Sequence, residues 1–124
     1  MDENEPLTFN EIVNRITRSL IFNVDLNTPR STRRFVQGIT DTNVTISIGV
    51  NNYETILFEN IYQMYTATIE NNGIYNKQIC LQILPNQTHN HGCTVHVVGM
   101  IFFRIGVMRI VDGRNYNVIL PKHL

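Results

Sequence analysis

The chain has 124 residues, 43% apolar and 16% charged, a composition typical of neither a disordered segment nor a membrane protein. This length is near the usual size of one domain and is enough to close a single core. The overall charge is zero, but residues 1–70 carry five basic and nine acidic residues, while residues 71–124 carry five basic and one acidic residue. The resulting +4 of the second part suits contact with phosphate, unless the two parts neutralise each other within one fold.

Three further features predict a cytoplasmic protein without membrane association. The first residues are acidic, whereas a signal peptide begins with basic ones. Two cysteines, Cys80 and Cys93, do not make a disulfide framework. The most apolar stretch, 95–111, is interrupted by one histidine and two arginines, so it does not predict a membrane-spanning helix.

The first helix is predicted by its start signal and its apolar spacing. Thr8-Phe9-Asn10-Glu11 is a capping-box pattern, in which the Thr8 hydroxyl and the Glu11 carboxylate satisfy the first free N–H groups of a helix. The apolar residues that follow at helical spacing are Phe9, Ile12, Val13, Ile16, Leu20 and Ile21. We expect a helix from Phe9 to about Phe22.

The middle of the chain predicts strands and then a second helix. Between residues 33 and 57, apolar residues alternate with other residues, which is the period of a half-buried strand. Polar turns at 41–43 and 51–52 divide this region into an antiparallel three-strand meander. Helical spacing returns over 58–69, and the Asn-Asn-Gly sequence at 71–73 is a helix stop.

Two more helices are predicted after this stop. The segment 74–84 predicts a short helix closed by Pro85, and a polar loop, 86–92, follows. The segment 94–105 predicts a longer helix, because its first residue is a threonine that can cap it and Gly106 is a stop signal. The β-branched and aromatic content of this segment also fits a buried strand, but the flanking residues favour the helix.

The end of the chain carries the strongest hairpin signal. Strand-forming residues occupy 107–111 and 114–120. Asp112-Gly113 between them suits the positive-φ positions of a type I′ turn. We therefore expect a hairpin whose strands are connected by two residues.

These elements together predict one compact α+β domain that spans residues 1–124. Residues 1–73 are expected to form a helix, a meander and a helix. Residues 74–124 are expected to form two helices and a hairpin. No internal repeat, low-complexity tract or linker-like stretch divides the chain.

The element order over residues 74–120 resembles the winged-helix family. In that family the helix before the hairpin enters the major groove of DNA, and the hairpin, or wing, touches the backbone or the minor groove. The resemblance implies that the segment from Thr94 to Arg104 is the recognition helix and that Arg109, Arg114 and Tyr116 lie on the wing. The candidate nucleic-acid-binding residues are Lys77, Thr94, His96, Arg104, Arg109, Arg114 and Tyr116.

Two functions remain open at this point. The first is a non-enzymatic nucleic-acid-binding accessory module, with DNA as the expected partner. The second follows from the composition of the recognition helix, on which only His96 and Arg104 look available for reading bases. Winged-helix members with such apolar helices often serve as protein-interaction modules. A homodimer or small inhibitor that uses the apolar Val95–Phe103 face is therefore the alternative.

The strands and helix of residues 33–70, followed by this module, also resemble the recognition modules of restriction-type endonucleases. That resemblance implies a role in recognition without cleavage, because the chain lacks the paired acid and Glu-x-Lys spacing of a metal-dependent nuclease core. In one-letter code His89-Asn90-His91 reads HNH, which is also the name of a nuclease motif. In that motif the three residues are spread over a different fold, so the adjacent tripeptide does not indicate a nuclease.

A cluster of potential metal ligands lies in the polar loop. His89, His91, Cys93 and His96 fall within eight residues. Structural zinc sites usually draw ligand pairs from two elements, and outside Cys80 and His123 the chain offers no such second pair. A cysteine nucleophile needs a base and usually an orienting group, and no Asp or Glu lies between Glu70 and Asp112. We expect no metal, no cofactor and no catalysis.

Three arginines, Arg30, Arg33 and Arg34, lie where the first strand begins. Such a group could clamp a phosphate. It could equally protect an edge strand against mispairing through its charge. We favour edge protection.

Overall fold

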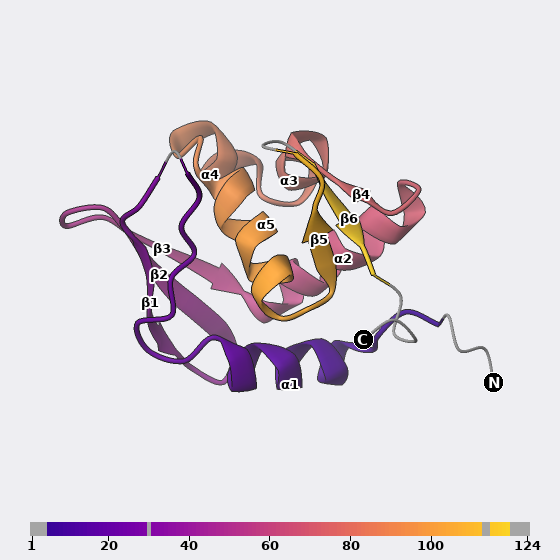
Figure 1. The fold of residues 1–124 in the computed structure, drawn as a ribbon, viewed down its shortest axis with the longest axis horizontal. Helices are drawn as coiled ribbons and strands as arrows, with labels where there is room; N and C mark the ends of the chain where they lie inside the picture. The colour runs from indigo at the N-terminus through magenta and orange to yellow at the C-terminus, as the bar shows by residue number, and fades with distance from the viewer. Residues whose placement is uncertain (1–4, 30, 113–114, 120–124) are drawn as a thin grey trace.

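A computed structural model describes residues 5–29, 31–112 and 115–119 of the chain. It confirms the α+β class, with an N-terminal helix, a three-strand antiparallel meander, a helix, and then helices and a C-terminal hairpin. In Figure 1, α5 lies between the meander and the C-terminal strands, and α1 runs along one side of the molecule. The elements are α1 (Phe9–Ser19), β1 (Arg34–Ile39), β2 (Asn43–Ile48), β3 (Tyr53–Leu57), α2 (Phe58–Glu70), β4 (Ile74–Tyr75), α3 (Lys77–Ile83), α4 (Pro85–Asn90), α5 (Thr94–Arg104), β5 (Met108–Ile110) and β6 (Tyr116–Val118).

The start of α1 is the predicted capping box. The Glu11 N–H donates to the Thr8 hydroxyl at 3.2 Å, and the Thr8 N–H donates to the Glu11 carboxylate at 3.0 Å. The helix ends at Ser19, three residues before the predicted Phe22. Residues 23–26 leave the helix because their backbone groups hydrogen-bond to the outer edge of β1.

The meander is antiparallel with strand order β1-β2-β3, as predicted. Along each strand, every second side chain points to the face of the meander that packs against the helices. The buried residues of that inner face are Arg34, Val36, Val44, Ile46, Glu54 and Ile56. Two of these residues are charged, and this is unusual for a core-facing position.

The segment 74–84 differs from the single short helix that was expected. Its first two residues form β4, which pairs with β6, so the C-terminal sheet has the strand order β4-β6-β5. Only Lys77–Ile83 is helical. This helix begins after Asn76, whose side-chain oxygen accepts hydrogen bonds from the Gln78 and Ile79 N–H groups.

The expected polar loop at 86–92 is largely helical. Pro85 begins α4 rather than only closing the helix before it. Proline is favoured at the first helical position because it lacks an N–H that would have no partner there. The prediction of a loop was therefore wrong for residues 86–90, where polar composition concealed a short helix.

The longer helix α5 forms as predicted, but Thr94 is not its cap. The residue before the helix is Cys93, and its side chain makes no capping hydrogen bond. Thr94 is the first helical residue, and its hydroxyl donates to the buried Glu54 carboxylate. The predicted stop is confirmed, since Gly106 follows the helix with φ of 79°, a value that glycine adopts without strain.

The C-terminal hairpin has a longer connection than expected. Ile110 pairs with Tyr116, and the Val111 N–H donates to the Asn115 carbonyl at 3.1 Å. β5 ends at Ile110 and β6 begins at Tyr116, so five residues, 111–115, separate the strands where a connection of two, flanked by Val111 and Arg114, was predicted. The type of turn at Asp112-Gly113 lies outside the described residues.

One continuous hydrophobic core joins both parts of the chain. Tyr75 and Phe102 meet edge to face near its centre, with ring centroids 5.5 Å apart. The Arg15 guanidinium on α1 donates to the carbonyl of Ile105 at 3.2 Å and so ties α1 to the end of α5. Among the described residues, no helix has both the length and the apolar character needed to cross a membrane.

Candidate nucleic-acid interface

The structure does not place the predicted nucleic-acid-binding residues on one surface. Thr94 is fully buried, and Tyr116 is buried beneath α5. A Cβ atom on Gly99 of α5 would lie 2.3 Å from two ring carbons of Tyr116, so the ring packs directly against the helix backbone. Thr94 therefore offers nothing for a phosphate to contact, and Tyr116 contributes only a small part of its side chain to the wall of a cavity.

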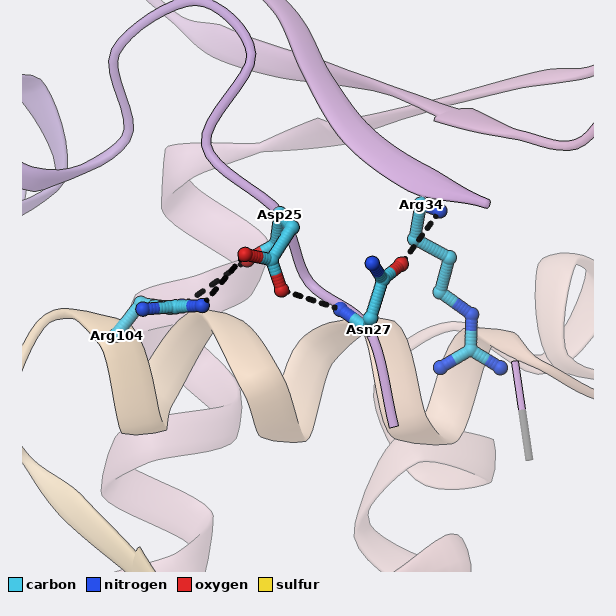
Figure 2. A network of polar contacts seen from close by, with 4 residues as sticks. All are labelled: Asp25, Asn27, Arg34 and Arg104. Atoms are coloured by element: carbon cyan, nitrogen blue, oxygen red, sulfur yellow. Dashed lines mark hydrogen bonds and ion pairs between the residues drawn. The ribbon is translucent and has the colours of Figure 1, made fainter. Parts of the chain in front are cut away.

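Arg104, predicted on the recognition helix, is engaged within the chain. Its guanidinium donates to the Asp25 carboxylate at 2.9 Å and to the Asp25 carbonyl at 3.0 Å (Figure 2). Hydrogen bonds to Asp25, the strongest from the Asn27 N–H and a weaker one from Arg104, lower the pKa of its carboxyl. This exposed pair fixes the loop before β1 against the end of α5.

The helix α5 as a whole is a core helix. Between Thr94 and Phe102, only His96 is not buried. A helix enclosed on nearly all sides cannot enter a major groove as the winged-helix resemblance implied. The apolar Val95–Phe103 face of the alternative hypothesis is likewise covered within the single chain, except at Phe103.

Two adjoining cavities lie beside the N-terminal half of α5. The smaller, of about 500 Å³, is lined by residues that include Asn76, Lys77 and Gln78 at the start of α3. The larger, of about 900 Å³, lies between the loop 27–31 and the C-terminal hairpin. Both are lined by Gly92, His96 and Asn115, so we treat them as one surface and call it the α5 groove.

The α5 groove contains some of the predicted residues and omits others. Lys77, exposed at one end, and His96, half-buried in the middle, both line it. Arg109 is exposed on β5 and pairs with Asn117, and alternation along the strand turns its side chain away from the cavity that the neighbouring Ile110 lines. Arg114 lies outside the described residues.

The residue that sequence reasoning undervalued is Arg34, in the wall of the larger cavity. Its side chain is only 5% exposed, and its Nη1 atom has no hydrogen-bond partner among the described residues. The backbone is well held, since the Arg34 N–H donates to the Asn27 side-chain oxygen at 2.9 Å and the Arg34 carbonyl accepts from Leu26. In Figure 2, the dashed line from Asn27 reaches this backbone nitrogen and none reaches the guanidinium.

Alternation along β1 explains why Arg34 faces inward. Arg34 and Val36 point to the buried face of the meander, whereas Arg33 is exposed. Arg33 and Arg34 therefore do not act together, and Arg30 lies outside the described residues. Arg33 fits the predicted protection of an edge strand, and Arg34 requires another explanation.

A second buried charge, Glu54, lies on the same inner face. It is 3% exposed and accepts hydrogen bonds from the Thr94 hydroxyl and, at 3.3 Å, from the Gln87 amide. Burial raises the pKa of the Glu54 carboxyl, although the hydrogen bond from Thr94 and the nearby charge of Arg34 act in the opposite direction. Among the described residues no ion pair joins Glu54 to Arg34, and the second Glu54 oxygen has no hydrogen-bond partner.

The histidine-rich segment around Cys93 forms no metal-binding group. Within the part of the chain that the structure describes, no three His, Cys, Asp or Glu side chains gather as metal ligands would. Burial raises the pKa of the Cys93 thiol, which favours the protonated form over a nucleophilic thiolate. The expectations of no metal and no catalysis stay predictions.

Comparison of the chain with protein-family models, curated proteins and solved structures finds no match. A function for this domain must therefore be argued from its own residues. The α5 groove is the feature from which we argue it.

Proposed function

We propose that this domain binds nucleic acid through the α5 groove. The observation that carries the proposal is the groove itself, which has Lys77 at one end, Arg34 at the other, and polar side chains between them. Phosphate contacts of this kind fix a nucleic acid in place without reading its sequence. The groove thus replaces the helix insertion that the sequence suggested.

The topology of the C-terminal part supports the proposal. The order α2, β4, α3, α4, α5, β5, β6, with β4 pairing to β6, resembles the winged-helix arrangement with the additional helix α4. A second departure from that family is the burial of α5. We therefore assign the contacts to side chains around the helix rather than to the helix surface.

The burial of α5 also determines what kind of binding to expect. Direct readout needs side chains that reach base edges with good hydrogen-bond geometry. Among the described residues of α5 that line the groove, only the half-buried His96 has a polar side chain that is not fully enclosed. We expect affinity that depends on phosphate charge and varies little with sequence.

A salt titration tests the proposal. Candidate contacts with the phosphates of a duplex are Lys77, at the exposed end of the groove, and, outside the described residues, Arg114. Each engaged phosphate should contribute about −0.9 to the log–log salt slope on duplex DNA, which predicts a slope of about −1 to −2 per protomer. Fluorescence anisotropy with a labelled duplex of mixed sequence, between low and physiological salt, measures this slope.

Single charge removals locate the binding surface. Lys77→Ala should weaken binding to all sequences and flatten the slope by about one, whereas Arg109→Ala, on the face of β5 that points away from the groove, should not. Arg18→Ala is the matched control, since Arg18 is an exposed arginine on α1 and no residue of α1 lines either cavity. Arg104→Ala should also leave binding unchanged because Arg104 already pairs with Asp25.

The proposal fails if the duplex does not bind at low salt. It also fails if the Lys77→Ala variant binds as tightly as the unaltered protein. A protein-interaction module would then be the better reading. Its surface would have to lie outside the buried part of the Val95–Phe103 face.

A further inference from the structure

The larger cavity of the α5 groove has a buried guanidinium in its wall, and the charge of Arg34 also acts on the nearby Glu54 carboxyl. Arg34 lines this cavity, is almost fully buried, and has an Nη1 atom without a hydrogen-bond partner among the described residues. A guanidinium stays charged at every pH that a protein tolerates and has five N–H donors to satisfy. Burial without an acceptor is costly, so the site lacks an anion or an equivalent acceptor.

The neighbouring acids do not supply that acceptor. No ion pair joins Arg34 to an acid among the described residues. Glu54 is held by Thr94 and Gln87 on its first oxygen and does not line the cavity. Asp112 lines the cavity from the hairpin connection, where its carboxylate accepts from the Asn115 N–H at 3.0 Å.

The form of the cavity limits which anion fits. Its volume of about 900 Å³ is within the range of pockets that enclose a nucleotide-sized ligand. Apolar atoms of Met100, Ile110 and Tyr116 line it together with the polar side chains of Asn27 and Asn115. Such a wall suits a sugar and base beside a phosphate, and the fork of a guanidinium suits the oxygens of a phosphate.

We propose that this cavity receives the phosphorylated end of a nucleic-acid strand, with its phosphate monoester bound by Arg34. A strand end fits better than an internal phosphate, because an internal phosphodiester could reach this buried side chain only by bringing both flanking nucleotides into the cavity. This inference rests on the proposed function and names the part of the nucleic acid that the groove selects.

The test compares strand ends. Single-stranded DNA of one sequence is prepared with a 5′-phosphate, with a 3′-phosphate and with hydroxyls at both ends. Binding is measured by competition against one labelled strand at physiological salt. We expect one phosphorylated form to bind about tenfold or more tightly than the hydroxyl form, since a charge-assisted contact is added.

Two variants assign this preference to a residue. Arg34→Met keeps the length and packing of the side chain without its charge, and it should abolish the preference for the phosphorylated end. Arg33→Met is the matched control, because it removes the same charge from the exposed neighbour and should keep the preference. Should Arg34→Met fail to fold, Arg34→Lys provides the second variant, which retains the charge but loses the fork and should reduce the preference.

The outcomes separate this inference from the proposed function. Equal binding of all three strands, with the expected salt slope, overturns the strand-end site and leaves the nucleic-acid groove standing. If no single strand binds, the strand-end site fails, and the nucleic-acid groove fails with it only if the duplex also does not bind at low salt. Binding of thymidine 5′-monophosphate but not thymidine, lost in Arg34→Met, would then mark a small-molecule site instead. A preference that survives in Arg34→Met but disappears in Arg33→Met also overturns the assignment.

Discussion

Substitution of Gly99 by alanine tests the packing that makes α5 a core helix. By helix propensity alone, alanine should stabilise the middle of a helix by about 1 kcal/mol relative to glycine. The structure predicts the opposite sign, because the new Cβ atom would lie 2.3 Å from two ring carbons of Tyr116 and 2.8 Å from a third. The ring is buried against Tyr75, with centroids 5.7 Å apart, and cannot move into solvent.

The size of the change in the free energy of unfolding follows from two opposed effects, the overpacking of the core and the gain in helix propensity. Overpacking of a core typically costs about 1–3 kcal/mol, and we take the upper end because the neighbour is a rigid aromatic ring. After the gain in helix propensity, the net loss in the free energy of unfolding should be about 2 kcal/mol. With a urea m-value of about 2 kcal/mol/M, the unfolding midpoint should fall by about 1 M.

Urea unfolding followed by circular dichroism measures this loss. Gly38→Ala is the matched control, since a Cβ atom there would meet nothing within 4 Å and the variant should be as stable as the parent. In a Tyr116→Leu background, Gly99→Ala should cost less, because the ring is gone. Stabilisation of the parent by Gly99→Ala would show that α5 and Tyr116 are not packed as described.

Three further predictions concern buried charges and metal. Burial raises the pKa of Glu54 in the folded protein, so this side chain stabilises the fold fully at pH values below its unfolded-state pKa, and this stabilisation is lost as the pH rises through its folded-state pKa. The free energy of unfolding of Glu54→Gln, relative to that of the parent, should therefore increase as the pH rises from 4.5 towards neutral. Urea unfolding at several pH values measures this difference. Arg34→Met should be as stable as the parent or more so without ligand, whereas a loss of about 3–5 kcal/mol would show that Arg34 is already paired inside the protein. Thermal unfolding should be unchanged in EDTA, and a large fall in Tm would reveal a structural metal at the histidine-rich segment.

The elements that could be predicted from sequence are those with local signals. The capping box at Thr8 and Glu11, the period-two alternation of the meander and the glycine stop at Gly106 each depend on neighbouring residues. The strand β4 could not be predicted this way, because its two residues are a strand only through pairing with β6, about forty positions later. The helix α4 was missed because its polar residues show no apolar period.

The candidate site was harder to predict, because it too depends on contacts between residues far apart in the sequence. Alternation with Val36 indicates that Arg34 faces inward, and this signal was present in the sequence. Which groups surround the guanidinium depends on loops far along the chain, so the unsatisfied charge is visible only in the fold. The burial of α5 was likewise hidden, since an apolar helix can pack within its own domain or against a partner.

Mapping a bound DNA onto the backbone tests most directly whether the α5 groove is the binding surface. Amide chemical shifts of the ¹⁵N-labelled protein would be followed by NMR during titration with a short duplex at low salt. We predict that the largest changes fall on residues 27–34, 76–78, 92–96 and 115–116, which surround the two cavities. Changes confined to α1 and the outer face of the meander, or no changes at all, would contradict the account.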